Sequence, residues 1–318
     1  MALTYPWLTP LADSWKQVLS NNRMTGALLL ESSKGLGVEQ LVEHFTQALA
    51  CNSSDGEACG FCHNCELAKA KVHPDIHWMQ PEKVGKAITV DQIRQCNRWA
   101  QESSQLGGKR LIIISPAEAM NESASNALLK TLEEPAQDCI FLLVTQNKPA
   151  LLATIVSRCQ CWRVEVPSTQ ECLSWLKTQD LHKVSDDAIV LNHGAPLEVF
   201  EFYQSGKDKQ YQQLIAAIQR YLESPLADPA PVWKLLKEST LEQLQWLSYL
   251  LLKLQKHHFG LVDAELQGLA SSLSYNSAYQ AMVSLNELVA QLTQFPGLNQ
   301  ELLVHDWLFK LHGKKDVC

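Results

Sequence analysis

Residues 31–40 read ESSKGLGVEQ, and this stretch decides how the N-terminal half of the chain is interpreted. It follows the apolar run from Ala27 to Leu30, which predicts a buried strand. It precedes an apolar pattern from Leu41 to Phe45 that suits a helix. A strand, a glycine-containing turn and a helix form the setting of a phosphate-binding loop. The alternative on this stretch alone is a turn with no relation to nucleotides.

The stretch departs from a working phosphate loop, whose pattern is G-x-x-x-x-G-K-[ST]. Ser32 replaces the first glycine, Gly37 keeps the second, and Gly35 lies between them. Val38 stands where a lysine would contact the outer phosphates, and Glu39 puts a carboxylate where a hydroxyl would hold magnesium. The shape of the loop is kept and its chemistry is lost, so we expect this chain to bind no ATP.

A second nucleotide motif is also incomplete. Leu111 to Ile114 predicts a buried strand, and in P-loop ATPases the acidic residues that serve magnesium and water follow such a strand. Here Ser115 and Pro116 occupy those positions, and Glu118 comes two residues late. Two incomplete motifs at the right separation indicate one degenerate site.

Four cysteines follow the loop helix, with the spacing C-x7-C-x2-C-x2-C: Cys51, Cys59, Cys62 and Cys65. Two C-x2-C steps allow the backbone to aim successive thiolates at one point. Four sulfur ligands make a closed tetrahedral zinc site of the structural type, with no position open for catalysis. Unligated thiols and an iron–sulfur cluster are the alternatives, and we treat the neighbouring His63 as solvated. We therefore expect one structural Zn²⁺.

Composition narrows the class of protein. The 318 residues leave room for two or three domains, and a formal charge of −7 argues against a chain that holds duplex nucleic acid on its own surface. No apolar run approaches the roughly 20 residues that span a bilayer, and the start MALTYPW lacks the basic and apolar parts of a signal peptide. Ten cysteines in this context favour metal binding over disulfides, so we expect a cytoplasmic protein with no membrane partner.

The rest of the chain continues the α/β pattern and then becomes helical. The predicted helices of the α/β part cover 91–102, 121–134 and 151–156, and its further strands cover 139–145 and 161–164. Beyond it, short helices are predicted at 171–178 and 186–191. Three later apolar stripes are typical of a helical bundle core: Leu214, Ile215, Ile218 and Leu222; Leu244, Leu247, Leu251 and Leu254; Met282, Leu285, Val289 and Leu292.

Two further motifs carry a family resemblance. The sequence SNALLKTLEEP at residues 125–135, followed by Ser157-Arg158-Cys159, resembles the signature of bacterial clamp-loader subunits of the AAA+ class. The four-cysteine insert after the loop is similar to that family's zinc module. The resemblance is strong over about residues 1–207 and weak beyond them.

The resemblance implies an architecture. An AAA+ P-loop-type parallel sheet domain with a zinc-binding insert would occupy 1–166. A small helical lid domain would occupy 167–207. A C-terminal all-α helical bundle, which forms a collar with neighbouring subunits, would occupy 208–318.

The resemblance also implies a function: a non-catalytic subunit of the DNA polymerase III clamp loader, acting as a stator. Its implied partners are the tau or gamma and delta subunits in a hetero-oligomeric ring, with the sliding clamp and primed DNA reached through the complex. Arg158, with Ser157 and Cys159 as its motif, is implied to be an arginine finger for a neighbouring ATPase subunit. In active members a sensor arginine follows a glycine similar to Gly194, whereas the sequence here continues Ala-Pro-Leu-Glu.

Three alternatives stay open. An active clamp-loader ATPase of the tau or gamma type would need the missing phosphate-loop groups. A zinc-containing nucleic-acid-binding module would need a basic surface. For Arg158 alone, the alternative is a surface arginine that satisfies a helix C-terminus, where cations are favoured.

Overall fold

A computed structural model describes most of the chain, as two compact units. The described residues are 3–21, 23–24, 26–52, 56–83, 85–134, 136, 138–226, 228–261 and 266–313. The first unit extends to Val184 and includes Asn192–Val199, and the second comprises Ser185–Leu191 and the chain from Phe200 onward. Among the helices of these segments, none combines the length and apolarity that a bilayer crossing requires.

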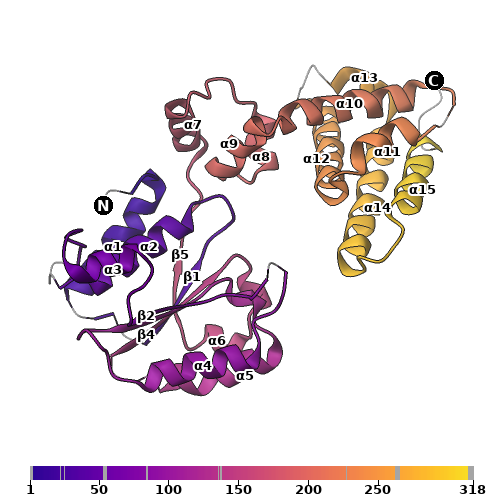
Figure 1. Ribbon diagram of the computed structural model, residues 1–318. Helices are drawn as coiled ribbons and strands as arrows, with labels where there is room; N and C mark the ends of the chain where they lie inside the picture. The colour runs from indigo at the N-terminus through magenta and orange to yellow at the C-terminus, as the bar shows by residue number, and fades with distance from the viewer. Residues whose placement is uncertain are drawn as a thin grey trace. The chain divides into compact units, whose positions relative to one another are not determined.

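The first unit is built on a parallel sheet (Figure 1). In the described residues its strands are β1 (Gly26–Glu31), β2 (Ile76–Met79), β3 (Arg110–Ile114), β4 (Cys139–Thr145) and β5 (Gln160–Arg163). Their order is β2-β3-β4-β1-β5, and every neighbouring pair is parallel. The strand that leads into the loop, β1, therefore lies between β4 and β5. Every residue of β3 and β4 is buried, as expected of a parallel sheet covered on both faces.

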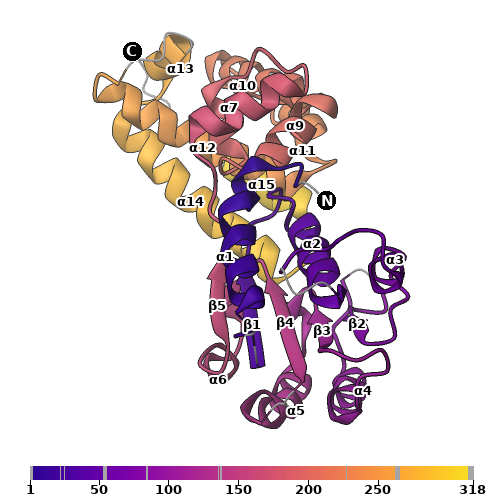
Figure 2. The same ribbon diagram turned by 90° about the vertical axis from the view of Figure 1, so that its left-hand side faces the viewer.

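Helices cover both faces of this sheet (Figures 1 and 2). The short 3₁₀ helix η1 (Pro6–Leu8), α1 (Thr9–Ser20) and α2 (Val38–Ala50) pack on one face, and α4 (Val90–Gln101), α5 (Glu122–Glu133) and α6 (Ala153–Val156) pack on the other. Side chains of a strand alternate between faces. In β1, Leu28 and Leu30 accordingly join the first core, and Ala27 and Leu29 join the second.

The remaining elements of the first unit are short. They are α3 (His63–Lys69), the 3₁₀ helices η2 (Ala117–Ala119) and η3 (Lys148–Ala150), and α7 (Thr169–Thr178). Helix α9 (Pro196–Gln204) begins in the first unit and ends in the second.

The second unit is helical. Its helices, besides the end of α9, are α8 (Asp186–Leu191), α10 (Lys207–Glu223), α11 (Ala230–Leu236), α12 (Thr240–His258), α13 (Gln267–Ser272), α14 (Tyr275–Gln294) and α15 (Gln300–Gly313). The predicted stripes supply much of its core: Leu214, Leu247 and Leu285 are each at most 2% exposed. Ile215, Met282 and Val289 are only partly buried, and Ala281 and Leu288 also belong to the buried face of α14. Trp307 of α15 joins this core and donates its indole N–H to the Ala281 carbonyl oxygen of α14 at 3.2 Å.

The expected fold class is confirmed: a parallel α/β domain precedes a helical C-terminal region. Strand β2 is not predicted from the sequence, because this four-residue edge strand has no continuous apolar run. Its residues Ile76, His77 and Trp78 are only partly buried. The division at residues 166 and 207 stays a prediction. Pro135, the last residue of the SNALLKTLEEP motif, lies outside the described residues.

A buried ion pair fixes the chain before β2 to the start of β3. Asp75 is 1% exposed and Arg110 is 2% exposed, and Arg110 Nη2 lies 3.2 Å from Asp75 Oδ1. The carboxylate also accepts hydrogen bonds from Ser104 Oγ and from the backbone N–H groups of Gln105 and Leu106, at 2.8 to 3.0 Å. Burial raises the pKa of Asp75, but these hydrogen bonds outweigh burial and hold the pKa below its usual value of 3.8.

We expect Asp75→Asn to lower the free energy of unfolding at neutral pH by about 3–5 kcal/mol, because it leaves the buried Arg110 charge with only the exposed Glu102 carboxylate, at 3.6 Å. A lowered carboxyl pKa contributes stability above the unfolded pKa, and this contribution is lost as the pH falls through the folded value. The wild type should therefore lose more stability than Asp75→Asn between about pH 5 and pH 2.

Denaturant unfolding followed by circular dichroism at several pH values measures both effects. Asp13→Asn is the matched control, because Asp13 is exposed on α1. Equal unfolding free energies for wild type and Asp75→Asn at neutral pH would contradict the structural role of the pair.

Candidate functional site

The loop between β1 and α2 has the backbone of a glycine turn. Gly35 has a φ of +77° and Gly37 a φ of +70°, the left-handed region that glycine adopts without a steric penalty. Gly37 directly precedes α2, so it sets the angle at which the helix leaves the loop. The two glycines retained in the sequence therefore have a conformational reason that is independent of any nucleotide.

The outer surface of this loop is covered by other parts of the first unit. A Cβ atom on Gly35 would lie 2.4 Å from Glu198 Cγ, and a Cβ atom on Gly37 would lie 2.4 Å from the Tyr5 ring. The Leu197 N–H donates to the Gly35 carbonyl oxygen at 3.2 Å. No methyl group fits between these glycines and their neighbours, so the side of the turn on which a Cβ atom would lie is closed by Glu198 and Tyr5.

The cation nearest these glycines in sequence is neutralised within the chain. Lys34 Nζ lies 3.0 Å from Glu198 Oε2 at the beginning of α9. No local sequence pattern predicts this pair, because the two residues are 164 positions apart. The segment from Gly194 to Glu198, noted above for its lack of a sensor arginine, thus supplies a carboxylate to the loop.

Aromatic side chains of the N-terminal segment and of α7 cover the loop. Tyr5 and Trp7 stack with ring centroids 5.3 Å apart, and Trp175 of α7 meets both rings edge-on at 5.9 and 5.4 Å. Trp7 Nε1 donates to the Leu36 carbonyl oxygen at 2.8 Å. The N-terminal segment and α7 therefore hold the loop in place, in an arrangement that the local sequence alone does not reveal.

The structure brings the two incomplete nucleotide motifs together. Val38, Glu39, Ser115 and Pro116 line one open cavity of about 390 Å³ at the carboxyl edge of the sheet. The other described lining residues are Val42, Trp78, Gln80, Pro81, Gly85, Val144 and Gln146. None of these described lining residues is a lysine or an arginine. Glu118 does not line the cavity; its Oε1 accepts a hydrogen bond from the Gln146 N–H at 3.0 Å.

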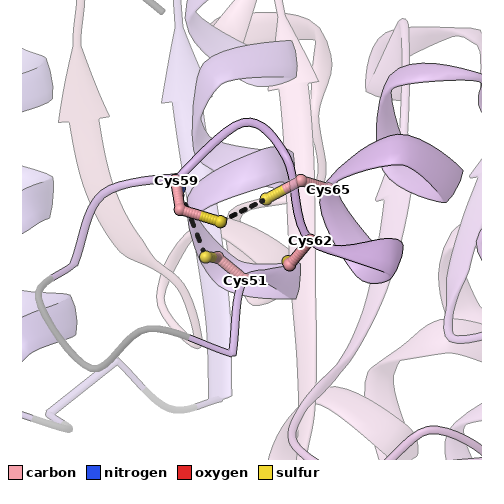
Figure 3. A group of neighbouring side chains, drawn as sticks. All are labelled: Cys51, Cys59, Cys62 and Cys65. Atoms are coloured by element: carbon pink, nitrogen blue, oxygen red, sulfur yellow. Dashed lines mark hydrogen bonds between the residues drawn. The ribbon is translucent and has the colours of Figure 1, made fainter.

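The four cysteines also converge (Figure 3). Their sulfur atoms all lie within 4.8 Å of one another, and Cys59 Sγ is 3.9 Å from Cys65 Sγ. Cys51 follows α2, Cys65 lies in α3, and Cys59 and Cys62 come from the connection between these helices. The residues drawn together are the four that the C-x7-C-x2-C-x2-C spacing selects, and they can hold one metal ion.

The electrostatics of this cysteine cluster are uneven. Hydrogen bonds from the backbone N–H groups of Cys65 and Asn52 lower the pKa of Cys62 to about 6. Burial raises the pKa of Cys65 to about 12. Four thiolates this close together repel one another, so a cation is required to hold all of them deprotonated at neutral pH.

Arg158 lies just after the C-terminal end of α6. Its Nη1 donates to the Thr154 carbonyl oxygen at 2.8 Å, which is the helix-end contact that the alternative interpretation of this arginine expects. Its Nε donates to Glu133 Oε1 at 2.8 Å, and its Nη2 contacts the same oxygen. Ser157 Oγ donates to the Thr154 carbonyl oxygen, and the partly buried Cys159 packs against the core formed with α4 and α5. The predicted finger is therefore engaged within its own chain.

Known protein families match both ends of the chain. A model described as "DNA polymerase III, delta subunit" matches residues 8–168, and one described as "DNA polymerase III, delta subunit, C terminal" matches residues 205–313. The fold and these matches define a subunit of DNA polymerase III.

Curated relatives specify which subunit family. The chain is 32% identical to DNA polymerase III subunit delta' of Haemophilus influenzae, over 98% of each chain. It is 31% identical to subunit delta' of Escherichia coli, over 96% of this chain and 95% of the relative, and 34% identical to that of Yersinia pestis, over 96% and 94%. The chain belongs to the DNA polymerase III subunit delta' family.

Two solved structures show more distant likeness. A DNA polymerase III gamma subunit-related protein of Thermotoga maritima superposes with a TM-score of 0.47 at 16% identity, covering 95% of this chain and 99% of that one. The RuvB Holliday junction branch migration motor of Thermotoga maritima gives a TM-score of 0.37 at 11% identity, over 74% of this chain and 69% of that one.

We expect protein purified without chelator to contain about one metal ion per chain, and Cys62→Ser to contain almost none, because a closed four-sulfur site tolerates no missing ligand. Acid should release the ion, since protonation of the thiolates removes the ligands that hold it. Elemental analysis of the purified chain is the measurement. Cys161→Ser is the matched control, because Cys161 is an exposed cysteine outside the cluster. Freshly prepared, folded wild type without metal would refute the site.

Proposed function

We propose that this chain is a non-catalytic subunit of the DNA polymerase III clamp loader and that it binds no ATP. It acts as a stator in a ring with the tau or gamma and delta subunits, and the ring places the sliding clamp on primed DNA in the cytoplasm. The chain is thereby an accessory subunit of a nucleotidyltransferase holoenzyme. One observation carries the proposal: the loop that would cradle phosphate is covered by Tyr5 and Glu198 of the same chain.

The charge of the neighbouring cavity supports the same conclusion. A nucleotide brings several negative charges, which a working site offsets with a lysine and a magnesium ion. The described residues of this cavity offer one carboxylate, from Glu39, and no cation. Lys34, which is close in sequence, is already paired with Glu198. Binding ATP there would require desolvating like charges against each other.

Two other functions have less support. An active clamp-loader ATPase would need a lysine at Val38 and carboxylates at Ser115 and Pro116. A zinc-containing nucleic-acid-binding module would need a basic surface, whereas the chain carries a formal charge of −7.

We assign the metal of the cysteine cluster as structural zinc. Zinc–sulfur bonds of about 2.3 Å in a tetrahedron place sulfur atoms roughly 3.8 Å apart. This value agrees with the 3.9 Å separation of Cys59 and Cys65 sulfurs. An iron–sulfur cluster would distribute the four cysteines over two or more iron atoms and would spread the sulfur atoms more widely. Zinc bound there joins the end of α2 to α3 and takes no part in chemistry.

Arg158 is the residue of this chain that we assign to catalysis in a neighbour. A chain without its own nucleotide has no use for an arginine aimed at an empty site. Supplied in trans, a guanidinium stabilises the charge that builds on a transferring phosphoryl group. The side chain is 33% exposed and follows a helix of only four residues, so it can turn outward without disturbing a long element.

The isolated chain should show no magnesium-dependent ATP affinity in the micromolar range, because the loop is covered and lacks cations. The double variant Val38→Lys and Glu39→Thr should not restore binding either, since Tyr5 and Glu198 still cover the glycines. Equilibrium binding of labelled ATP measures both, with an active tau or gamma subunit as the positive control. Micromolar binding of ATP by the wild type would contradict the proposal.

Arg158→Ala should leave folding and complex assembly intact and lower the DNA- and clamp-stimulated ATP hydrolysis of the adjacent subunit. Loss of a principal finger costs on the order of 10³ to 10⁵ in turnover at its own site, and total hydrolysis falls less because other sites continue. Arg158→Lys should not rescue fully, since lysine lacks the planar fork of donors.

Steady-state ATPase assays on the reconstituted loader test this role. The matched control is Arg163→Ala, which removes an exposed arginine from the neighbouring strand β5. Unchanged stimulated turnover in Arg158→Ala would contradict the finger role. The contact with the helix end would then be the remaining role of this arginine.

A further inference from the structure

The ion pair between Arg158 and Glu133 occupies donor groups that an arginine finger would need for its target. Three of the guanidinium's donor groups are used inside the chain: Nε and Nη2 by Glu133 Oε1, and Nη1 by the Thr154 carbonyl oxygen. Glu133 is the last residue of α5, and Arg158 follows α6, so two separate helix ends meet at this ion pair. An arginine held this way cannot present the same donors to a phosphate group of another subunit.

The partner that holds the arginine is also chemically similar to the target. A carboxylate and a phosphate oxygen both accept from the guanidinium fork, but the phosphate carries more negative charge. Arg158 is 33% exposed and Glu133 is 47% exposed, so their mutual attraction is weakened by water. The contact is therefore strong enough to bias the side chain and weak enough for a phosphate to displace it.

We propose that Glu133 is a positioning residue that keeps Arg158 retracted until a neighbouring subunit presents its bound nucleotide. This inference rests on the proposed finger role of Arg158. In the retracted state, Glu133 neutralises the guanidinium, and the adjacent ATP site lacks its finger. When the ring closes, the phosphate group replaces the carboxylate, and Glu133 is left solvated at the end of α5. The retraction suppresses hydrolysis before the loader has engaged clamp and DNA.

The expected size of the effect follows from the exposure of the pair. Exposed ion pairs shift an equilibrium by roughly 1.5- to 5-fold. The fraction of molecules in which Arg158 is free to contact the neighbouring nucleotide changes by the same factor. The rate of ATP hydrolysis that depends on this contact changes in proportion. In Glu133→Gln the neutral amide can still accept a hydrogen bond, but the charge assistance is lost.

The test uses the reconstituted loader containing Glu133→Gln. We expect ATP turnover without clamp or DNA to rise roughly 1.5- to 5-fold, and the stimulated maximal turnover to stay unchanged, because closure displaces the side chain at position 133 in both proteins. Glu134→Gln is the matched control: it removes the same charge one residue along, from an exposed side chain, and should change neither rate. Glu133→Asp, with a shorter carboxylate side chain, should lie between wild type and Glu133→Gln.

A second measurement does not depend on activity. In the isolated chain, the Arg158 Nε–H proton should exchange with water more slowly than that of an exposed arginine such as Arg163, and Glu133→Gln should accelerate it several-fold. Nuclear magnetic resonance with ¹⁵N-labelled arginine detects both.

The outcomes separate this inference from the finger role. If Arg158→Ala lowers stimulated turnover but Glu133→Gln leaves the unstimulated rate unchanged, retraction is wrong and the finger remains. If Glu133→Gln lowers the stimulated rate, Glu133 orients the finger for catalysis, and retraction is again wrong. If Arg158→Ala itself has no effect, the proposed function of Arg158 fails first.

Discussion

The parallel strands of the sheet are covered by helices on both faces, and this burial decides where the functional segments lie. Because every strand runs the same way, the connections that leave the strands meet at one edge. The loop after β1 and the turn after β3 are about 80 residues apart in sequence, and they line one cavity. The side chains of β1 fix this arrangement, since a shift of one residue would move Leu28 and Leu30 into the core that now holds Ala27 and Leu29.

At that edge the chain preserves the shape of a phosphate-binding loop and uses it for internal packing. Gly35 and Gly37 keep their left-handed backbone, but the space beside them is taken by Glu198 and Tyr5. The loop thereby connects the N-terminal segment, the sheet and the first turn of α9 through packing contacts. A glycine turn covered in this way fits the proposed role of a subunit that supports its neighbours and has no nucleotide of its own.

The geometry of the cysteine cluster and that of Arg158 depend on the tertiary structure to different extents. Cys51, Cys59, Cys62 and Cys65 form a local unit between α2 and α3, whose geometry depends on a short stretch of chain. Arg158 depends on two helices that converge from distant parts of the sequence. Its contact with Glu133 is electrostatic and partly exposed, in contrast to the buried pair of Asp75 and Arg110. The first kind of contact can act as a switch, and the second holds the fold.

The sequence by itself determined the local features. The strand, glycine turn and helix around residues 26–50, the apolar stripes of the C-terminal helices and the four-cysteine spacing are all encoded over short distances, where periodicity and turn chemistry act. Only the tertiary structure decided the rest. The edge strand β2 has no apolar run of its own, Lys34 meets Glu198 across 164 positions, and Glu133 meets Arg158 across 25. These pairs form because packing of the sheet brings distant segments together, and no local pattern records which partners will meet.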